Sequence, residues 1–124
     1  MSGPDKAVLV VDDDVELLGM LETLLVGAGY RVITATGGQE ALEKVAQEMP
    51  ALILLDMKMP GMDGWAFART FWARYGRAAA IVVLTAAENA RQHAGELGAE
   101  DYLSKPFEIE DLVRIVARYM DTPA

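Results

Sequence analysis

Five short apolar or β-rich segments alternate with five segments of helical periodicity along the 124 residues of the chain. The segments that predict strands are residues 7–11, 30–35, 51–55, 79–84 and 101–103. The segments that predict helices are residues 13–26, 39–49, 65–75, 87–97 and 109–120. Because parallel crossovers are right-handed, this alternation favours a parallel sheet with helices on both faces. The sequence therefore predicts an α/β, doubly wound domain with a five-stranded parallel sheet.

A carboxylate directly follows one predicted strand, within the stretch LILLDMKMPGMDG at residues 52–64. The apolar run before Asp56 is uninterrupted, which is typical of a strand buried on both faces, and the loop after it is rich in Gly and Pro. Open α/β sheets place ligands and chemistry beyond the carboxyl ends of their strands. On this stretch alone, Asp56 is consistent with a turn-capping residue as well as with a reactive group.

Polar side chains also follow the other predicted strands. Asp12 and Asp13 follow the first strand, Thr85 follows the fourth, and Lys105 lies just beyond the fifth. The carboxyl ends of parallel strands share one edge of the sheet. We therefore expect these side chains to meet Asp56 in one cleft.

The three carboxylates of this cleft would repel one another and raise one another's pKa values unless a cation lay between them. Mg²⁺ suits a site with one or two carboxylates, waters and a phosphate oxygen. Lys105 adds a positive charge and Thr85 a hydroxyl donor, so the group predicts a phosphoryl site. The chain has no Cys, a single His among polar residues and no GxxxxGK[ST] loop, which leaves a carboxylate as the nucleophile.

The composition further narrows the class of protein to which the chain can belong. The chain is 52% hydrophobic and lacks cysteine, which predicts a globular domain without disulfides or thiolate metal sites. Its apolar runs are too short to span a membrane, and residues 1–6 have no signal core, so we expect a cytoplasmic protein. A formal net charge of -8 argues against direct binding of nucleic acid. We expect one domain over residues 1–124, with a core at about 6–120 and no output domain visible.

Four segments resemble the signature blocks of response regulator receiver domains of two-component signalling, the CheY-like superfamily. They are VVDDD at 10–14, LLDMKMPGMDG at 54–64, VVLTAA at 82–87 and YLSKPF at 102–107. The resemblance covers essentially the whole chain. It implies a flavodoxin-like fold with strand order 2-1-3-4-5 and an aspartate that accepts phosphate from a sensor histidine kinase or a histidine phosphotransfer protein. Such a chain is a phosphoacceptor, rather than an enzyme, that assists its own phosphorylation and dephosphorylation.

Carried over by motif position, Asp56 is the phosphoacceptor. The resemblance implies that Mg²⁺ is held by Asp13, Asp56 and the main-chain carbonyl of Lys58. Asp12 would help to position a metal-bound water.

The resemblance also implies a switch. On phosphorylation, the Thr85 hydroxyl would move to a phosphoryl oxygen, Lys105 would pair with the phosphate, and Tyr102 would turn inward behind Thr85. A cis peptide bond at Lys105-Pro106 is a further implication. The surface that changes shape would contact a downstream effector or form a phosphorylation-dependent dimer. It comprises the last two helices and the strand between them, residues 87–97, 101–103 and 109–120.

Two other functions compete with this interpretation. A haloacid-dehalogenase-like phosphatase would use Asp12 as nucleophile, because Asp12 and Asp14 have its D-x-D spacing at a strand end. The chain lacks the cap domain and later acidic motif of such enzymes, and the loop after Asp56 would have no role. A pseudo-receiver that binds partners without phosphate is the second alternative, although every residue of the phosphoryl site is present.

Several side chains have plain structural interpretations. Asp13 and Glu16 have the form of a helix-capping box, and Asp14 is expected to be a solvated turn residue. Tyr102 is expected to pack partly in the core, and His93 to be exposed on a helix with a thin apolar stripe. Three methionines are expected to line or cover the cleft: Met57, Met59 and Met62.

Overall fold

The computed structural model describes residues 6–121, and residues 1–5 and 122–124 lie outside the described residues. The strands are β1 (Ala7–Val11), β2 (Arg31–Ala35), β3 (Leu52–Asp56), β4 (Ala80–Ala86) and β5 (Asp101–Lys105). The helices are α1 (Val15–Gly27), α2 (Gly38–Gln47), α3 (Gly64–Tyr75), α4 (Ala87–Leu97) and α5 (Ile109–Met120). All strand pairs are parallel, in the order β2-β1-β3-β4-β5, which confirms the predicted doubly wound, flavodoxin-like fold.

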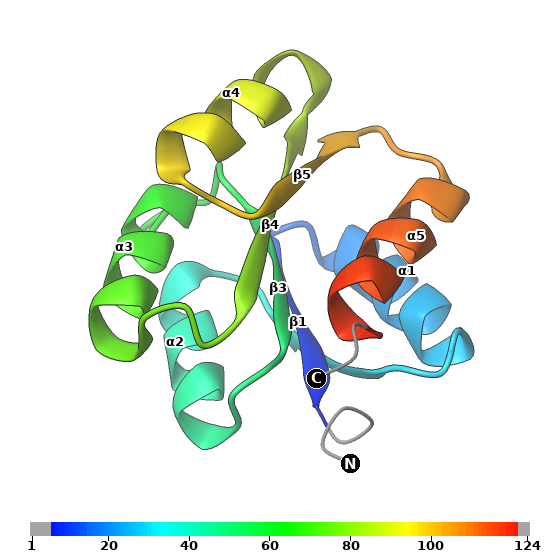
Figure 1. The fold of residues 1–124 in the computed structure, drawn as a ribbon, viewed down its shortest axis with the longest axis horizontal. Helices are drawn as coiled ribbons and strands as arrows, with labels where there is room; N and C mark the ends of the chain where they lie inside the picture. Colours follow the sequence, from blue (N-terminus) through cyan, green and yellow to red (C-terminus); the bar gives the residue numbers. More distant parts are fainter. Residues whose placement is uncertain (1–5, 122–124) are drawn as a thin grey trace.

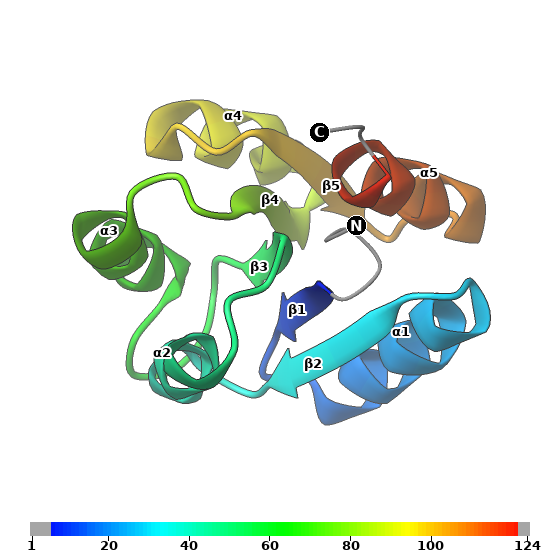
Figure 2. The ribbon, with the colours of Figure 1, turned by 60° about the horizontal axis from the view of Figure 1, so that its bottom comes forward.

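The helices cover both faces of the sheet. Figure 1 shows α1 and α5 on one face and α2, α3 and α4 on the other, and Figure 2 shows the same two layers from a second direction. Along β1, Leu9 and Val11 face the layer of α2 to α4, whereas Val8 and Val10 face α1 and α5. Because successive strand side chains point to opposite faces, each central strand contributes to two apolar cores.

Three strands, β3, β4 and β5, extend further toward the polar residues than their predicted bounds. Asp56 is the last residue of β3 and pairs in register with Leu84, rather than being the first residue after the strand. Thr85 lies inside β4, and Lys105 is the last residue of β5. Ladder pairing to a neighbouring strand extends each element past the point where hydrophobicity ends. The polar side chains are therefore held by the sheet itself.

The first turn of α1 differs from the predicted capping box. Asp14, not Asp13, is the N-cap, and its carboxylate accepts a hydrogen bond from the Leu17 N–H at 3.1 Å. The expectation that Asp14 is only a solvated turn residue is therefore wrong. Val15 is 68% exposed, so the buried stripe of α1 begins at Leu18. Starting the helix one residue later leaves Asp13 outside it and available to the site.

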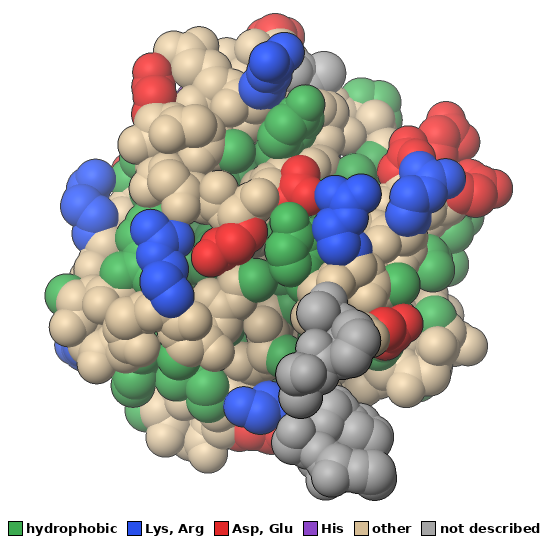
Figure 3. Space-filling view, in the orientation of Figure 1, with side chains coloured by type: hydrophobic (Ala, Val, Ile, Leu, Met, Phe, Trp, Pro, Cys, Tyr) green, Lys and Arg blue, Asp and Glu red, His purple; other side chains and the backbone are tan. Residues whose placement is uncertain are grey.

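Charges are interspersed on the face drawn in Figure 3. Lys and Arg side chains lie there singly, among acidic and uncharged residues, rather than in a continuous stripe. Within residues 6–121, no helix is long and apolar enough to cross a membrane.

Candidate functional site: a carboxylate cluster at the sheet edge

Three carboxylates converge where β1 and β3 end. Asp12 and Asp13 follow β1, Asp56 ends β3, and carboxylate oxygens of the three lie within 4.8 Å of one another. Asp12 and Asp56 are only 1% and 5% exposed, whereas Asp13 is exposed. The backbone of Asp12 is fixed by a hydrogen bond from its N–H to the Ala35 carbonyl of β2 at 3.1 Å. The predicted meeting of these acids is confirmed.

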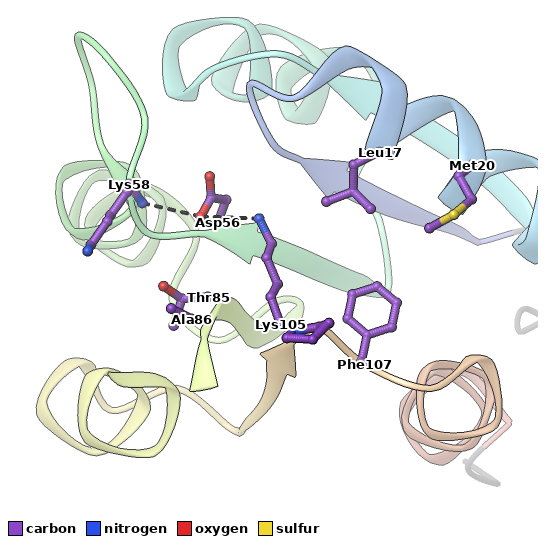
Figure 4. Close-up of a pocket in the computed structure, with 9 residues that line it drawn as sticks. Leu17, Met20, Asp56, Lys58, Thr85, Ala86, Lys105 and Phe107 are labelled. Atoms are coloured by element: carbon purple, nitrogen blue, oxygen red, sulfur yellow. Dashed lines mark hydrogen bonds and ion pairs between the residues drawn. The ribbon is translucent and has the colours of Figure 1, made fainter. Parts of the chain in front are cut away.

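Lys105 connects two of the carboxylates. Its Nζ lies 2.7 Å from Asp12 Oδ2 and 3.8 Å from Asp56 Oδ1. The Lys58 backbone N–H donates to the same Asp56 oxygen at 3.3 Å. Figure 4 shows the Lys105 ammonium directed at Asp56 from β5, while the Lys58 side chain points away. Asp56 Oδ1 thus faces two positively polarised groups.

The environment of Asp56 disfavours its ionised form. Burial, followed by repulsion from Asp12 and, more weakly, Asp13, raises the pKa of Asp56 from 3.8 to about 6. The Lys105 ammonium and the Lys58 N–H act in the opposite direction. A divalent cation among these oxygens would relieve the repulsion, and an all-oxygen donor set is the one that Mg²⁺ prefers. The residues present therefore fit a magnesium site.

A cavity of about 550 Å³ opens onto the cluster. Thr85, which is 3% exposed, lines it together with Asp56 and Lys105. Beyond Lys105 the cavity becomes apolar, as Figure 4 shows. That end is lined by Leu17 and Met20 of α1 and by Pro106 and Phe107 after β5.

Sequence reasoning missed the apolar end of the cavity. Two features of the sequence could have indicated this apolar end. Leu17 and Met20 lie off the buried stripe of α1, and Phe107 follows the predicted Lys-Pro turn. The predicted cis peptide at Lys105-Pro106 is confirmed. Met57 and Met59 are buried in the core on the α2 to α4 side rather than lining the cleft, so that expectation is wrong.

The loop after Asp56 returns tightly onto the strand. The Gly64 N–H donates to the Met57 carbonyl at 3.2 Å. A Cβ on Gly64 would lie 2.7 Å from the Asp56 carbonyl oxygen and 2.8 Å from Met57 Cα. Only glycine allows this approach, which keeps the start of α3 against the end of β3.

Two further side chains differ from expectation. Tyr102 is 38% exposed, because β5 is an edge strand with little cover, so the prediction that it packs partly in the core is wrong for this conformation. His93 is half-buried, and its ring centroid lies 5.5 Å from that of Trp65 in an edge-on contact.

The fold and the site define a class: a doubly wound domain with an acidic cluster, of a kind that could hold a metal ion, at the carboxyl edge of its sheet. Residues 8–117 match the response regulator receiver domain family, and the chain belongs to that family. It is thus a receiver domain of the response regulator type, as its signature blocks predict. Membership of this family supports the receiver-domain interpretation and argues against the dehalogenase-like phosphatase.

Relatives and solved structures agree with this assignment. The chain is 40% identical to a probable transcriptional regulator, ycf27, of Pyropia yezoensis, over 98% of this chain and 51% of that protein. It is 39% identical to the DNA-binding transcriptional regulator NtrC of Escherichia coli K12, over 90% of this chain and 24% of NtrC. The chain therefore spans only part of these relatives.

Among solved structures, the response regulator TrrA of Thermotoga maritima in complex with Mg²⁺-BeF is 32% identical, with a TM-score of 0.82. The match covers 92% of this chain and 98% of that one.

Proposed function

We propose that Asp56 accepts a phosphoryl group from a phosphohistidine of a sensor kinase or a phosphotransfer protein. The observation that carries the proposal is the position of its carboxylate, with Asp12 and Asp13 oxygens within 4.8 Å and the Lys105 ammonium at 3.8 Å. An Asp56 oxygen attacks phosphorus, the phosphorus–nitrogen bond breaks, and the imidazole leaves with the electron pair. Lys105 faces the charge that develops on the phosphoryl oxygens.

In this proposal Mg²⁺ is held by Asp13, Asp56 and the main-chain carbonyl of Lys58, and Asp12 orients a metal-bound water. The oxygen cluster and the raised pKa of Asp56 support this placement. The magnesium complex of TrrA supports it within the family. When bound, the ion neutralises charge on the phosphoryl oxygens.

The switch that we propose begins at Thr85 and Lys105. Lys105 exchanges its ion pair with Asp12 for one with the phosphoryl group, and the buried Thr85 hydroxyl moves toward a phosphoryl oxygen. Tyr102 then turns from its exposed position into the space that Thr85 leaves. The surface of α4, β5 and α5 changes shape for an effector or a second copy of the chain. The phosphoryl group biases this equilibrium only as far as its contacts differ between the two states.

The apolar end of the cavity supports a protein as the phosphodonor. Leu17, Met20 and Phe107 form an apolar wall beside Lys105, and Met20 is 47% exposed. Exposed apolar surface next to a reactive group is suited to receive the helix that carries a phosphohistidine.

The test is intact-mass spectrometry after incubation with phosphoramidate and Mg²⁺. We expect one acid-labile phosphoryl group on the wild type and none on Asp56→Asn. Glu22→Gln, which changes an exposed carboxylate without a hydrogen bond or ion pair to any described residue, should be labelled like the wild type. A label that survives in Asp56→Asn, or turnover that depends on Asp12 instead, would contradict the proposal. An unlabelled wild type would favour the pseudo-receiver.

A further inference from the structure

The two ends of α4 are held very differently. At its C-terminal end, Gly98 adopts a left-handed conformation (φ 84°), and its N–H closes the helix on the Ala94 carbonyl at 2.9 Å. At its N-terminal end, Ala86 is the N-cap and offers no side-chain hydrogen bond. The N-terminal end of α4 closely follows Thr85, at the carboxyl ends of the strands, whereas Glu100, two residues beyond Gly98, pairs with Ile81 near the start of β4.

Arg77, in the turn between α3 and β4, connects α3 to the C-terminal end of α4. Its guanidinium lies 3.9 Å from the centroid of the Trp72 ring. Its Nη1 donates to the Gly98 carbonyl at 2.8 Å and lies 3.6 Å from Glu100 Oε2. The planar guanidinium can stack and donate at the same time, which a lysine cannot do equally well.

Glu100 connects the C-terminal end of α4 to β4. Its Oε1 accepts a hydrogen bond from the Ile81 N–H at 2.8 Å, and its own N–H donates to the Ile81 carbonyl at 3.0 Å. Its carbonyl also accepts from the Tyr119 hydroxyl of α5 at 3.3 Å. Residues 98–100 are thus joined to α3, β4 and α5.

The remainder of α4 is held weakly. Among the described side chains of α4, the buried apolar ones are Ala90 and Ala94, which contribute far less apolar area than the Leu, Ile and Phe of the other helices. His93 meets Trp65 through ring edges, and its buried Nδ1 has no hydrogen-bond partner among the described residues. Displacing the N-terminal half of α4 therefore exposes little apolar area of the described side chains.

We propose that Arg77 is a positioning residue that fixes the C-terminal end of α4, so that α4 responds to the site by swinging its N-terminal end about residues 98–100. This inference rests on the proposed function, because the phosphoryl site is the source of the signal. Thr85 and Ala86 connect that site to the N-terminal end of α4. A movement at Thr85 is then converted into a rotation of α4 relative to α3, rather than a translation of the whole helix.

Hydrogen exchange of the full chain, followed by mass spectrometry, tests the anchor without any phosphoryl group. In Arg77→Ala, we expect local opening of residues 94–101 to rise about tenfold, as for the loss of one hydrogen bond to a charged donor. Glu100→Gln should show a smaller rise in the same segment, because its amide oxygen still accepts from Ile81. Arg74→Ala is the matched control: Arg74 is exposed on α3 and has no hydrogen bond or ion pair to a described residue.

Adding beryllium fluoride with Mg²⁺ to the same variants tests the swing. In the wild type, exchange should change mainly in residues 86–92, whereas in Arg77→Ala the change should extend through residue 101. A uniform change along α4 in the wild type, or an Arg77→Ala protein that exchanges like Arg74→Ala, would overturn the inference. If beryllium fluoride alters exchange nowhere and phosphoramidate does not label Asp56, the proposed function fails and the swing with it. The exchange of the unmodified variants would still confirm or refute the anchor.

Discussion

Replacing Asp56 with asparagine should stabilise the folded protein in the absence of metal. The pKa of this carboxyl is about 6 in the folded protein, whereas its ordinary value is 3.8. Well below pH 3.8 the group is mostly protonated in both states. As the pH rises to about 6, the unfolded chain ionises first, so the folded state loses stability across this window. Each pKa unit corresponds to about 1.4 kcal/mol, so the loss reaches about 3 kcal/mol above pH 7.

Urea denaturation followed by circular dichroism, with a chelator present, measures this difference. Near pH 7.5 the Asp56→Asn protein should exceed the wild type by up to about 3 kcal/mol in free energy of unfolding, and near pH 4 by well under about 1 kcal/mol. Glu22→Gln controls for the removal of one acidic charge from a protein of net charge -8. Mg²⁺ should stabilise the wild type more than Asp56→Asn, because ligands that bind only the folded state add to its stability.

The result that would refute this reasoning is a gain that does not depend on pH. If Asp56→Asn were equally stabilised near pH 4 and pH 7.5, ionisation of a buried carboxylate could not be its cause. A variant less stable than the wild type at both pH values would contradict the direction of the pKa shift itself.

Three further substitutions have definite expected outcomes. Lys105→Ala should leave Mg²⁺ affinity largely intact but abolish the phosphorylation-induced NMR shifts around Tyr102; unchanged shifts would contradict its role in the switch. Asp14→Ala should lower the free energy of unfolding by about 1 kcal/mol through loss of the α1 N-cap, measured by urea denaturation, whereas a neutral effect would remove its capping role. Gly64→Ala should destabilise the fold by about 1–3 kcal/mol and lower the rate of labelling by phosphoramidate, because its Cβ overlaps the Asp56 backbone. Normal stability in Gly64→Ala would show that the loop can move aside.

The fold and the residues that make up the site could be predicted, because both follow from patterns that are local in the sequence. Apolar runs such as residues 52–55 set the strands, helical stripes set the crossovers, and right-handed crossovers leave few topologies. The carboxyl ends of the strands must then share an edge, so Asp12, Asp56 and Lys105 could be brought together without any structure. No distance between them was needed for that step.

Details that depend on competition between neighbours could not be predicted. Asp13 and Asp14 are both good N-caps, and only the backbone path after β1 decides that Asp14 caps α1 while Asp13 stays at the site. Met57 looked like a cleft residue because it follows Asp56, yet the tight return at Gly64 directs it into the core. Arg77 gave no signal, since the two residues that it holds by a hydrogen bond and an ion pair, Gly98 and Glu100, lie about twenty residues further along the chain.

The charges at the sheet edge explain why one lysine has two partners. Three carboxylates and one ammonium give the ionised site a net charge of about -2, and the repulsion from Asp12 and Asp13 adds to burial in raising the pKa of Asp56. A divalent cation would bring the site close to neutrality and would weaken the hold of Asp12 on Lys105. Phosphorylation would then replace one carboxylate charge with a phosphoryl charge of about -2, by analogy with other phosphorylated side chains, and give Lys105 a stronger partner than Asp12. In the switch that we propose, the pairing of Lys105 with Asp12 at 2.7 Å would mark the resting state, and its release would be the first event on the way to Thr85 and α4.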